Sequence, residues 1–453
     1  MGKITLQQAA LWCGGKINEK YKDVTFFGAN NDSRKLEEGQ LFVALQGARD
    51  GHDFVPAALK KGAAAILCNH CDGDYPAIVV EDTRLALGQI ARGERERIGM
   101  QVVGVTGSVG KSTTKEMIAA VLKTTYRVAK TPENHNNDIG MPMAILSIPK
   151  DTQVAVLEMG MNHFGEISYL TAIAKPDVAV IINVGTVHIE NLGSVEGILQ
   201  AKLEILEGVP QNGTVILNGD NALLWQQQGK VDKKTLYFGV ENAESAVLGQ
   251  AVRQTETGLT FTVKHNGEEF SIALPMLGEH YVPDALAAIA VGLEMGVSIE
   301  NIQSAMAQFQ NMAGRQEIYE KNGFTIIQDC YNAGPESMTA ALNVLGSRSG
   351  RRVAVLGDML ELGVCADAEH YKIGRHAAKN ADVLLAYGPN SKRTLYGAIT
   401  GGMTENSARA FTDREVLVQV LKQVVKPGDT LLFKGSLGMR MKQLLDMFLE
   451  QTC

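Results

Sequence analysis

The chain has 453 residues, 45% of them hydrophobic and 21% charged, with a formal net charge of -7. This composition is that of an ordinary globular protein, and the length predicts about three domains. The mildly negative charge argues against a nucleic-acid partner, which favours a basic face. No segment approaches the roughly 18 apolar residues of a membrane span, and the N-terminus lacks the pattern of a secretory signal. We therefore expect a cytoplasmic protein without a membrane span.

The six cysteines are scattered along the chain. Cys68 and Cys71 have the spacing of half a zinc knuckle, but a matching second half is missing. A disulfide framework is not expected in so long a chain without a signal segment. The cysteines are interpreted as reduced thiols rather than as a zinc site.

Apolar runs outline an α/β protein of three domains. Residues 1–98 have a mixed α/β pattern, which predicts a small N-terminal domain. In the central domain, 99–313, buried strands are predicted at 100–105, 153–157, 177–182 and 214–217, with a helix at 111–125. In the C-terminal domain, 314–453, strands are predicted at 325–328, 353–356, 383–386 and 430–433. Continuous apolar strands alternating with helices predict parallel sheets, one in the central domain and one in a Rossmann-like, doubly wound C-terminal domain.

The segment Gly104–Thr114 has the pattern of a phosphate-binding loop between a strand and a helix. Gly107 and Gly110 allow backbone N–H groups to close around phosphate oxygens, and the helix N-terminus adds a favourable dipole. Lys111 can reach the β- and γ-phosphates, and the Ser112 hydroxyl can ligate Mg²⁺. The strict motif has glycine where this chain has Val105, so the loop is a variant form.

Two polar residues follow buried strands, where ligands of such sheets bind. Glu158 ends one strand, in the position of a second carboxylate of a nucleotide site, or is a solvated strand-end acid. His188 follows another strand and is either a metal ligand or a hydrogen-bonded core histidine.

Lys202 lies within an apolar helical stripe. Ser194 can cap a helix that extends to about Gly208, and Ile198, Lys202 and Ile205 fall on one face of it. Burial disfavours the charged amine, and a neutral amine can react with CO₂ to give a metal-binding carbamate. The alternative is a snorkelling lysine with a buried stem and a solvated ammonium.

These residues together resemble the Mur ligase family of ATP-dependent amide ligases, which act in peptidoglycan precursor synthesis. The phosphate loop, Glu158 to Asn162, His188 and Lys202 match the family pattern in order and spacing. The resemblance implies that Glu158, His188 and a carbamylated Lys202 bind Mg²⁺ together with Ser112. It also implies a catalytic set of Lys111, Glu158, His188, Lys202 and Arg315, the last contacting the γ-phosphate. Arg315 is otherwise a surface arginine after a domain linker.

The resemblance extends over the whole chain and implies two further sets of residues. The expected ATP-binding residues are Gly107, Ser108, Val109, Gly110, Lys111, Ser112, Thr113, Asn137, His280, Arg315, Asp329, Tyr331 and Asn332. The residues expected to bind the UDP-linked substrate are Asn31, Ser33, Arg34, Gln46, Gly47 and His52.

The motifs at 134–140, 329–338 and 356–363 favour the activity that joins D-alanyl-D-alanine to UDP-N-acetylmuramoyl-tripeptide. By resemblance, ATP converts the tripeptide carboxylate into an acyl phosphate, and the amine of the dipeptide attacks it. The amine acceptor is expected near Asn332 and the loop after Asp358, on a chain that acts as a monomer. Alternatives are a ligase with another acceptor, such as a folylpolyglutamate synthetase or the ligase that adds diaminopimelate or lysine. A small-molecule kinase or a nucleotide switch is more remote, since the guanine motif Asn-Lys-x-Asp is missing.

Four positions depart from the family pattern. Glu133 stands where glycine is usual, Asp284 replaces the second asparagine of His-Asn-x-x-Asn, and Gly334 replaces the asparagine of Tyr-Asn-Ala-Asn-Pro. Leu437 replaces the arginine of Lys-Gly-Ser-Arg, for which Arg440 is a candidate substitute.

Overall fold

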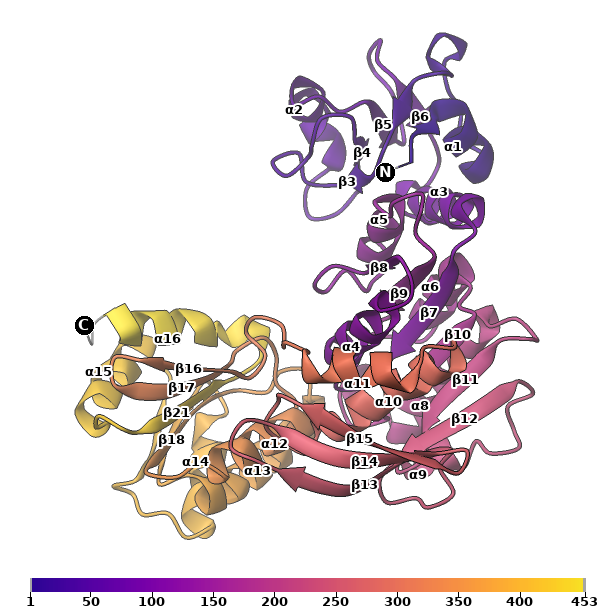
Figure 1. Ribbon diagram of the computed structural model, residues 1–453. Helices are drawn as coiled ribbons and strands as arrows, with labels where there is room; N and C mark the ends of the chain where they lie inside the picture. The colour runs from indigo at the N-terminus through magenta and orange to yellow at the C-terminus, as the bar shows by residue number, and fades with distance from the viewer. Residues whose placement is uncertain (1, 451–453) are drawn as a thin grey trace.

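The computed structural model describes residues 2–450, and its sheets divide the chain into three consecutive parts (Figure 1). The N-terminal part has a two-stranded antiparallel sheet, β1-β2, and a four-stranded parallel sheet, β3-β4-β5-β6. Its elements are β1 (Ile4–Thr5), α1 (Leu6–Cys13), η1 (Glu19–Tyr21), β2 (Thr25–Phe26), β3 (Ala29–Asn30), β4 (Leu41–Val43), η2 (Gly51–Phe54), α2 (Val55–Lys60), β5 (Ala65–Cys68), β6 (Ala77–Val79) and α3 (Thr83–Ile98).

The central part has a nine-stranded sheet in the order β15-β14-β13-β12-β11-β10-β7-β9-β8. Strands β7 to β13 are parallel, and β14 and β15 add an antiparallel extension. The elements are β7 (Gln101–Thr106), α4 (Lys111–Lys123), β8 (Val128–Lys130), α5 (Gly140–Leu146), β9 (Val154–Glu158), α6 (Glu166–Ala174), β10 (Val178–Ile181), α7 (Ile189–Leu192), α8 (Val195–Leu203), η3 (Glu204–Gly208), β11 (Thr214–Asn218), α9 (Ala222–Trp225), β12 (Lys234–Gly239), β13 (Val247–Gln254), β14 (Leu259–His265), β15 (Glu268–Leu274), α10 (Tyr281–Glu294) and α11 (Ile299–Ala307).

The C-terminal part has a six-stranded sheet in the order β16-β17-β21-β18-β19-β20, parallel except for the edge strand β16. Its elements are β16 (Glu317–Lys321), β17 (Phe324–Asp329), α12 (Pro335–Gly346), β18 (Arg352–Gly357), η4 (Gly363–Cys365), α13 (Ala366–Asn380), β19 (Val383–Tyr387), α14 (Ser391–Thr400), β20 (Ala408–Phe411), α15 (Arg414–Val424), β21 (Thr430–Lys434), η5 (Leu437–Met439) and α16 (Met441–Glu450). The predicted α/β class and its two parallel sheets are confirmed.

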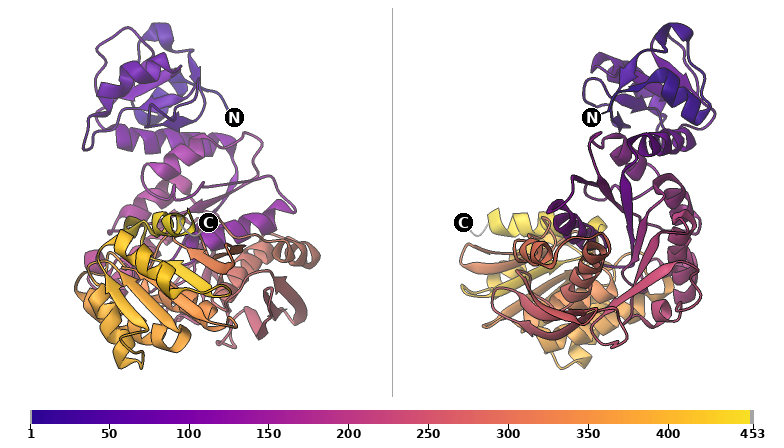
Figure 2. Two further views of the ribbon diagram at one scale, coloured as in Figure 1. Left: turned by 90° about the vertical axis from the view of Figure 1, so that its left-hand side faces the viewer. Right: turned by 45° about the vertical axis from the view of Figure 1, so that its right-hand side comes forward.

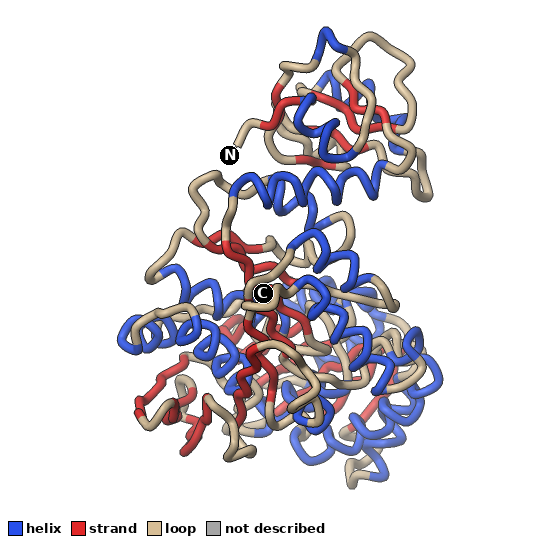
Figure 3. The backbone as a smooth tube through the Cα atoms, turned by 90° about the vertical axis from the view of Figure 1, so that its right-hand side faces the viewer, coloured by secondary structure: helices blue, strands red, loops and turns tan. Residues whose placement is uncertain are grey.

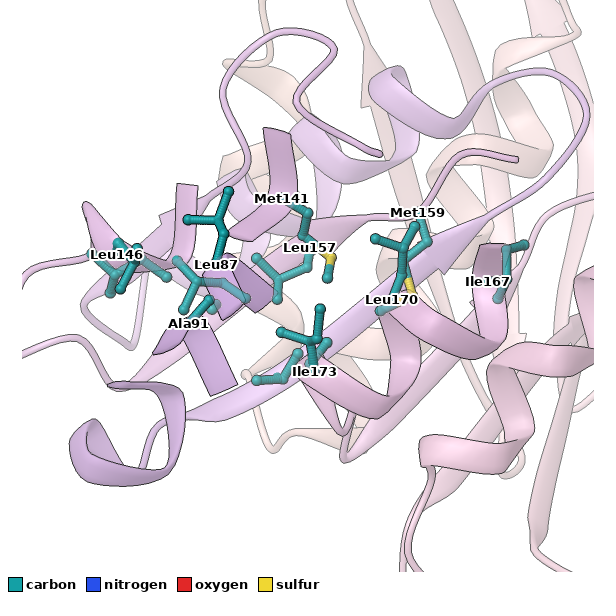
Figure 4. Close-up of a cluster of buried hydrophobic side chains, with 14 of the residues drawn as sticks. Leu87, Ala91, Met141, Leu146, Leu157, Met159, Ile167, Leu170 and Ile173 are labelled. Carbon is teal, nitrogen blue, oxygen red and sulfur yellow. The ribbon is translucent and has the colours of Figure 1, made fainter. Parts of the chain in front are cut away.

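Helix α3 joins the N-terminal part to the central one. Asp82 caps its start, and Gly99 ends it in the left-handed conformation. Leu87 and Ala91 of α3 share a buried core with residues of α5, β9 and α6, including Met141, Leu157 and Leu170 (Figure 4). Figure 2 and Figure 3 show the N-terminal part standing clear of the C-terminal part, with α3 at the junction to the central part. A boundary at residue 98 therefore falls just after a helix that both parts share.

Two further observations bear on the expectations from sequence. In residues 2–450 no helix combines the length and apolar character needed to cross a membrane. Cys13, Cys68, Cys71, Cys330 and Cys365 are free thiols, and Cys453 lies outside the described residues.

Candidate active site

A cavity of about 650 Å³ lies between the central and C-terminal parts. Its central wall includes the phosphate loop between β7 and α4 and the residues that follow β9 and β10, at the carboxyl ends of the parallel strands. The predicted residues in the wall are Ser108, Val109, Gly110, Lys111, Ser112, Thr113, Asn137, Glu158, His188, His280, Arg315, Asp329, Tyr331 and Asn332. Gly107 and Lys202 lie outside the set that lines it.

The phosphate loop is held by one asparagine that sequence analysis did not identify. Asn183 Oδ1 accepts hydrogen bonds from Ser108 N (2.9 Å) and Val109 N (3.0 Å), and its amide donates to Val109 O. Gly110 ends the loop with φ of 84°, which favours glycine, and α4 begins at Lys111. The first N–H groups of α4 have no partner within the helix and remain available to an anion.

Lys111 folds back onto the loop. Its Nζ donates to Gly107 O (2.8 Å) and to Ser108 O (3.3 Å). Burial lowers the pKa of Lys111, although the charge of Glu158 opposes this effect. An incoming phosphate would restore the ammonium form, because an opposite charge nearby favours the charged state.

Glu158 ends β9 and is 2% exposed, which does not fit a solvated strand-end acid. Its Oε1 accepts from Asn136 Nδ2 at 2.8 Å, and its Oε2 lies 3.8 Å from Lys115 Nζ. Oε2 has no hydrogen-bond partner among residues 2–450. A buried carboxylate oxygen that faces a cavity without a partner suits a bound cation.

His188 meets a residue of the C-terminal part. It precedes α7 with φ of 68°, and its Nδ1 lies 3.1 Å from Glu361 Oε2. Glu361 belongs to the loop after β18, and its contact with His188 lowers the pKa of the Glu361 carboxyl. This pair connects the two walls of the cavity.

Lys202 is buried in α8, as the apolar stripe predicts. Its side chain is 1% exposed, which does not fit the snorkelling alternative. No ion pair of Lys202 is found within the described part of the chain. Burial, followed by the charge of Lys111, places the pKa of the Lys202 amine well below its ordinary value. A neutral amine of this kind has the protonation state that carbamylation needs.

Arg315 joins the C-terminal part to the phosphate loop. Its Nη2 donates to Ser112 Oγ at 2.9 Å, and its guanidinium lies over the ring of Tyr331, 4.1 Å from the centroid. Its Nε is buried without a hydrogen-bond partner in residues 2–450. These contacts do not fit a surface arginine. They hold the guanidinium beside Ser112 of the phosphate loop.

Several residues that shape the opposite wall were missed by sequence analysis. Lys434 Nζ bridges Asp329 Oδ2 (2.7 Å) and Asn332 O (2.9 Å), and its position just after an apolar run was an available signal. Glu336 Oε1 accepts from the N–H and hydroxyl of Thr186 at 3.1 and 3.2 Å. Glu336 and Glu361 depend on contacts between distant segments, which no local pattern reveals.

Three of the four departures, Glu133, Gly334 and Leu437, have distinct surroundings. Glu133 has φ of 39°, in the left-handed region where the usual glycine is favoured. A Cβ on Gly334 would lie 3.1 Å from Val187 Cγ2, so a larger side chain there would crowd the His188 loop. Leu437 lines the cavity and is 59% exposed, whereas Arg440 is not part of the wall.

The donors around the loop fit a hard cation such as Mg²⁺ in part. Ser112 and Glu158 both line the cavity, and Glu158 Oε2 accepts no hydrogen bond among the described residues, although Lys115 Nζ lies 3.8 Å from it. Mg²⁺ needs one or two protein oxygens when substrate phosphates complete its shell. No group of three His, Cys, Asp or Glu side chains in residues 2–450 is arranged to bind a metal alone.

The residues predicted for the UDP-linked substrate lie in the N-terminal part, away from the cavity. Asn31, Ser33 and Arg34 follow β3, Gln46 and Gly47 follow β4, and His52 lies in η2. Because β3, β4 and β5 are parallel, the segments after them meet at one edge.

Two of these side chains, those of Arg34 and His52, already have partners. Arg34 pairs with Asp32 at 2.8 Å and holds the pKa of Asp32 at about 2. His52 Nε2 accepts from Asn69 N (3.1 Å), and its ring stacks on His70. Asn69 and His70 lie between Cys68 and Cys71, and their contacts with His52 add them to the residues at this edge.

Three family models match the chain in order. Residues 26–95 match the Mur ligase family catalytic domain, 105–292 the Mur ligase middle domain, and 314–437 the Mur ligase glutamate ligase domain. The UDP-N-acetylmuramoyl-tripeptide–D-alanyl-D-alanine ligase of Bacillus subtilis strain 168 is 39% identical over 99% of both chains.

Solved structures agree with these matches over the full length. The crystal structure of MurF from Acinetobacter baumannii has a TM-score of 0.92 and 32% identity, covering 99% of both chains. MurF ligase from Thermotoga maritima in complex with ADP has a TM-score of 0.83 and 30% identity, covering 94% of this chain and 98% of that one. The chain belongs to the Mur ligase family.

Proposed function

We propose that this chain is the ATP-dependent, ADP-forming ligase that joins D-alanyl-D-alanine to UDP-N-acetylmuramoyl-tripeptide in peptidoglycan precursor synthesis. The observation that carries the proposal is the cavity in which the phosphate loop, Glu158 and Arg315 converge from both parts. Full-length identity to relatives with this activity supports the choice of substrates.

The reaction begins with the terminal carboxylate of the tripeptide attacking the γ-phosphorus of ATP. An acyl phosphate forms, and ADP leaves. The amine of D-alanyl-D-alanine then attacks the acyl carbon, loses a proton, and releases inorganic phosphate as the amide bond forms. The difficulty of the first step is electrostatic, because a carboxylate must approach a triphosphate.

Positive groups on both walls of the cavity would offset this repulsion. Lys111 and the free N–H groups at the start of α4 face the phosphates, and Arg315 approaches from the C-terminal side. Ser112, Glu158, His188 and carbamylated Lys202 would bind Mg²⁺, which would neutralise charge on the transferring phosphoryl group. Asn137, His280, Asp329, Tyr331 and Asn332 form the remaining wall for the nucleotide. We place the dipeptide near Asn332 and the loop that carries Glu361.

The carbamate of Lys202 has its own test. Lys202→Ala should lower kcat by at least about 100-fold, because one ligand that orients the charged centre is removed. Acetate or propionate should restore part of that activity by replacing the lost carboxylate. Lys115→Ala is the control for rescue alone: Lys115 is equally buried and lies 3.8 Å from Glu158, but it donates to the backbone carbonyl of Thr131 and no carboxylic acid should replace it. A fully active Lys202→Ala variant, or equal rescue of both variants by the acid, would exclude the carbamate.

Compartment, assembly and domain limits follow from the same proposal. ATP and nucleotide-linked sugars are cytoplasmic metabolites, and free thiols suit that reducing compartment. We propose a cytoplasmic monomer with domains at 1–98, 99–313 and 314–453. Each of the four sheets lies within one of these ranges, which supports the division. The sedimentation velocity of the purified chain tests the monomer.

The decisive assay measures phosphate release from ATP with the nucleotide-tripeptide and D-alanyl-D-alanine added singly and together. Turnover should require both substrates. D-Alanyl-D-alanine replaced by diaminopimelate, lysine or glutamate tests the ligases with other acceptors. Phosphate release without either substrate would favour a nucleotide switch, and transfer of phosphate to a stable product would favour a kinase.

A further inference from the structure

Asp284 is a buried carboxyl group in the wall of the nucleotide cavity. It lies in the first turn of α10 and is 5% exposed. Its Oδ1 accepts a hydrogen bond from Thr114 Oγ1 at 3.0 Å. Within residues 2–450 no ion pair includes Asp284. A buried carboxylate without a cationic partner is costly, so the neutral acid is the form that this setting favours.

The same carboxyl group lies directly against the phosphate loop. A Cβ placed on Gly110 would lie 2.4 Å from Asp284 Oδ1 and 3.2 Å from Oδ2, so both oxygens sit over the last glycine of the loop. The nucleotide phosphates are expected at the N–H groups that begin one residue later. An ionised Asp284 would therefore repel the phosphates, because like charges held close together raise the energy of the complex.

The surroundings of Asp284 offer little compensation for a negative charge. Its own helix presents Tyr281 and, at the far end, Glu294, which pairs with Lys234 of β12. Helix α4 presents Lys111, bound to the loop carbonyls, and Lys115, bound to Thr131 O. Arg315 is the charged group that lowers the pKa of Asp284, and Glu300 of α11 is exposed. Burial outweighs these effects and raises the pKa of Asp284 to about 8.

We propose that Asp284 positions the nucleotide as a neutral carboxylic acid, accepting from Thr114 at Oδ1 and carrying its proton on Oδ2. In this form it presents one acceptor and one donor without charge, as the asparagine of the family pattern does. Ionisation removes the donor and adds a charge beside the phosphates. Nucleotide binding is therefore coupled to a proton at this one atom, a property beyond the ligase activity itself. The proposal rests on the proposed use of ATP but not on the identity of the amine.

The coupling predicts how nucleotide affinity changes with pH. A ligand that binds only the protonated form loses about tenfold affinity for each pH unit above the pKa. The Kd of Mg-ADP for the full chain should therefore rise about tenfold or more between pH 7.5 and pH 9.5. Asp284→Asn keeps the neutral shape, so its Kd should change much less over this range and should match that of the unmodified chain at pH 7. Any loss caused by deprotonation of Lys111 is common to both proteins and cancels in their ratio.

Isothermal titration calorimetry with Mg-ADP in buffers of different ionisation enthalpy measures both the Kd and the protons taken up. At pH 8.5 the unmodified chain should take up between about one half and one proton more than Asp284→Asn. Glu294→Gln, which removes a carboxylate at the other end of α10, is the matched control and should behave as the unmodified chain. Because uptake is also measured on the unmodified chain, an unstable variant does not block the test.

Two results would overturn the proposal: equal proton uptake in the unmodified chain and Asp284→Asn, or a loss of affinity beyond tenfold in Asp284→Asn at pH 7. The second would mean that Asp284 acts as an anion. Neither result bears on the choice of amine substrate. Failure of the ligase assay with intact Mg-ADP binding would in turn leave this proposal standing.

Discussion

At the scale of single residues, the site depends on buried groups whose charge the fold suppresses. Lys202 and Asp284 are both buried, and each has its pKa shifted toward the neutral form. Lys111 is shifted in the same direction. An anionic substrate that binds beside such groups changes which of their forms is favoured, because an added negative charge favours a protonated amine and a neutral carboxylic acid.

The raised pKa of Asp284 also predicts how the stability of the folded chain changes with pH. Its pKa is about 8 in the folded chain against an ordinary 3.8, so the folded state binds more protons between these values. The contribution of this group to the free energy of unfolding therefore falls as pH rises from about 4 to about 8, and is constant above that range. Asp284→Asn should have the higher Tm at pH 8, with a gap that narrows toward pH 5. Thermal unfolding at both pH values measures it, and a gap that is equal or larger at pH 5 would contradict the buried neutral acid.

Residues near strand ends were predictable, whereas partners across the cavity were not. Glu158, His188 and Asp329 follow apolar runs, and parallel strands bring such positions to one edge. The place of Lys202 within an apolar stripe followed from the 3.6-residue period of the helix, but the burial of its amine did not, because a snorkelling lysine fits the same stripe. Glu336 and Glu361 acquire their roles only when two domains meet, and nothing within a few residues of either encodes that contact.

At the scale of elements, the phosphate loop is stabilised from the neighbouring strand. Asn183 follows β10, next to β7 in the sheet, and binds the backbone of Ser108 and Val109. Asn183→Ala would leave the Val109 N–H without this partner and the Ser108 N–H with only the backbone carbonyl of residue 183, at a cost of about 1 to 3 kcal/mol. We expect a lower Tm and a Kd for Mg-ADP raised about tenfold, measured by calorimetry. Asn406→Ala, in an exposed loop, is the control; unchanged affinity in Asn183→Ala would show that the loop holds its shape alone.

The predicted strands were those with continuous apolar runs. β7, β9, β10 and β11 are covered on both faces and lack polar interruptions. The antiparallel extension was missed because β14 alternates, with Leu259, Phe261 and Val263 buried and the residues between them more exposed. The predicted helix from Ser194 to Gly208 is correct in extent, but its last turn narrows to the 3-10 segment η3 after Leu203.

At the scale of the whole molecule, the two ends of the nucleotide-tripeptide are expected in different parts. The edge that carries Arg34 and His52 lies in the N-terminal part, which stands apart from the C-terminal part (Figure 1), and no residue of the N-terminal part lines the cavity. Helix α3 connects the N-terminal and central parts and packs on α5 and α6. We therefore expect a long substrate to extend from the N-terminal part toward the cavity.

Closure of the parts should accompany binding. The cavity is formed by two walls joined by contacts such as Glu336 with Thr186, and an acyl phosphate must be shielded from water. Small-angle scattering should show a smaller radius of gyration with a non-hydrolysable ATP analogue and the nucleotide-tripeptide together than with either alone. Identical radii of gyration for the unliganded chain, the two single complexes and the double complex would contradict closure.

In the proposed reaction, ATP activates the tripeptide carboxylate because the γ-phosphoryl group of ATP is transferred to a carboxylate oxygen. The direct measurement uses nucleotide-tripeptide labelled with ¹⁸O in its terminal carboxylate, followed by mass spectrometry of the phosphate released on amide formation. When the amine displaces phosphate, the bridging oxygen leaves with phosphorus, so each phosphate should carry one ¹⁸O atom. Phosphate free of ¹⁸O, released together with the amide product, would exclude an acyl phosphate intermediate.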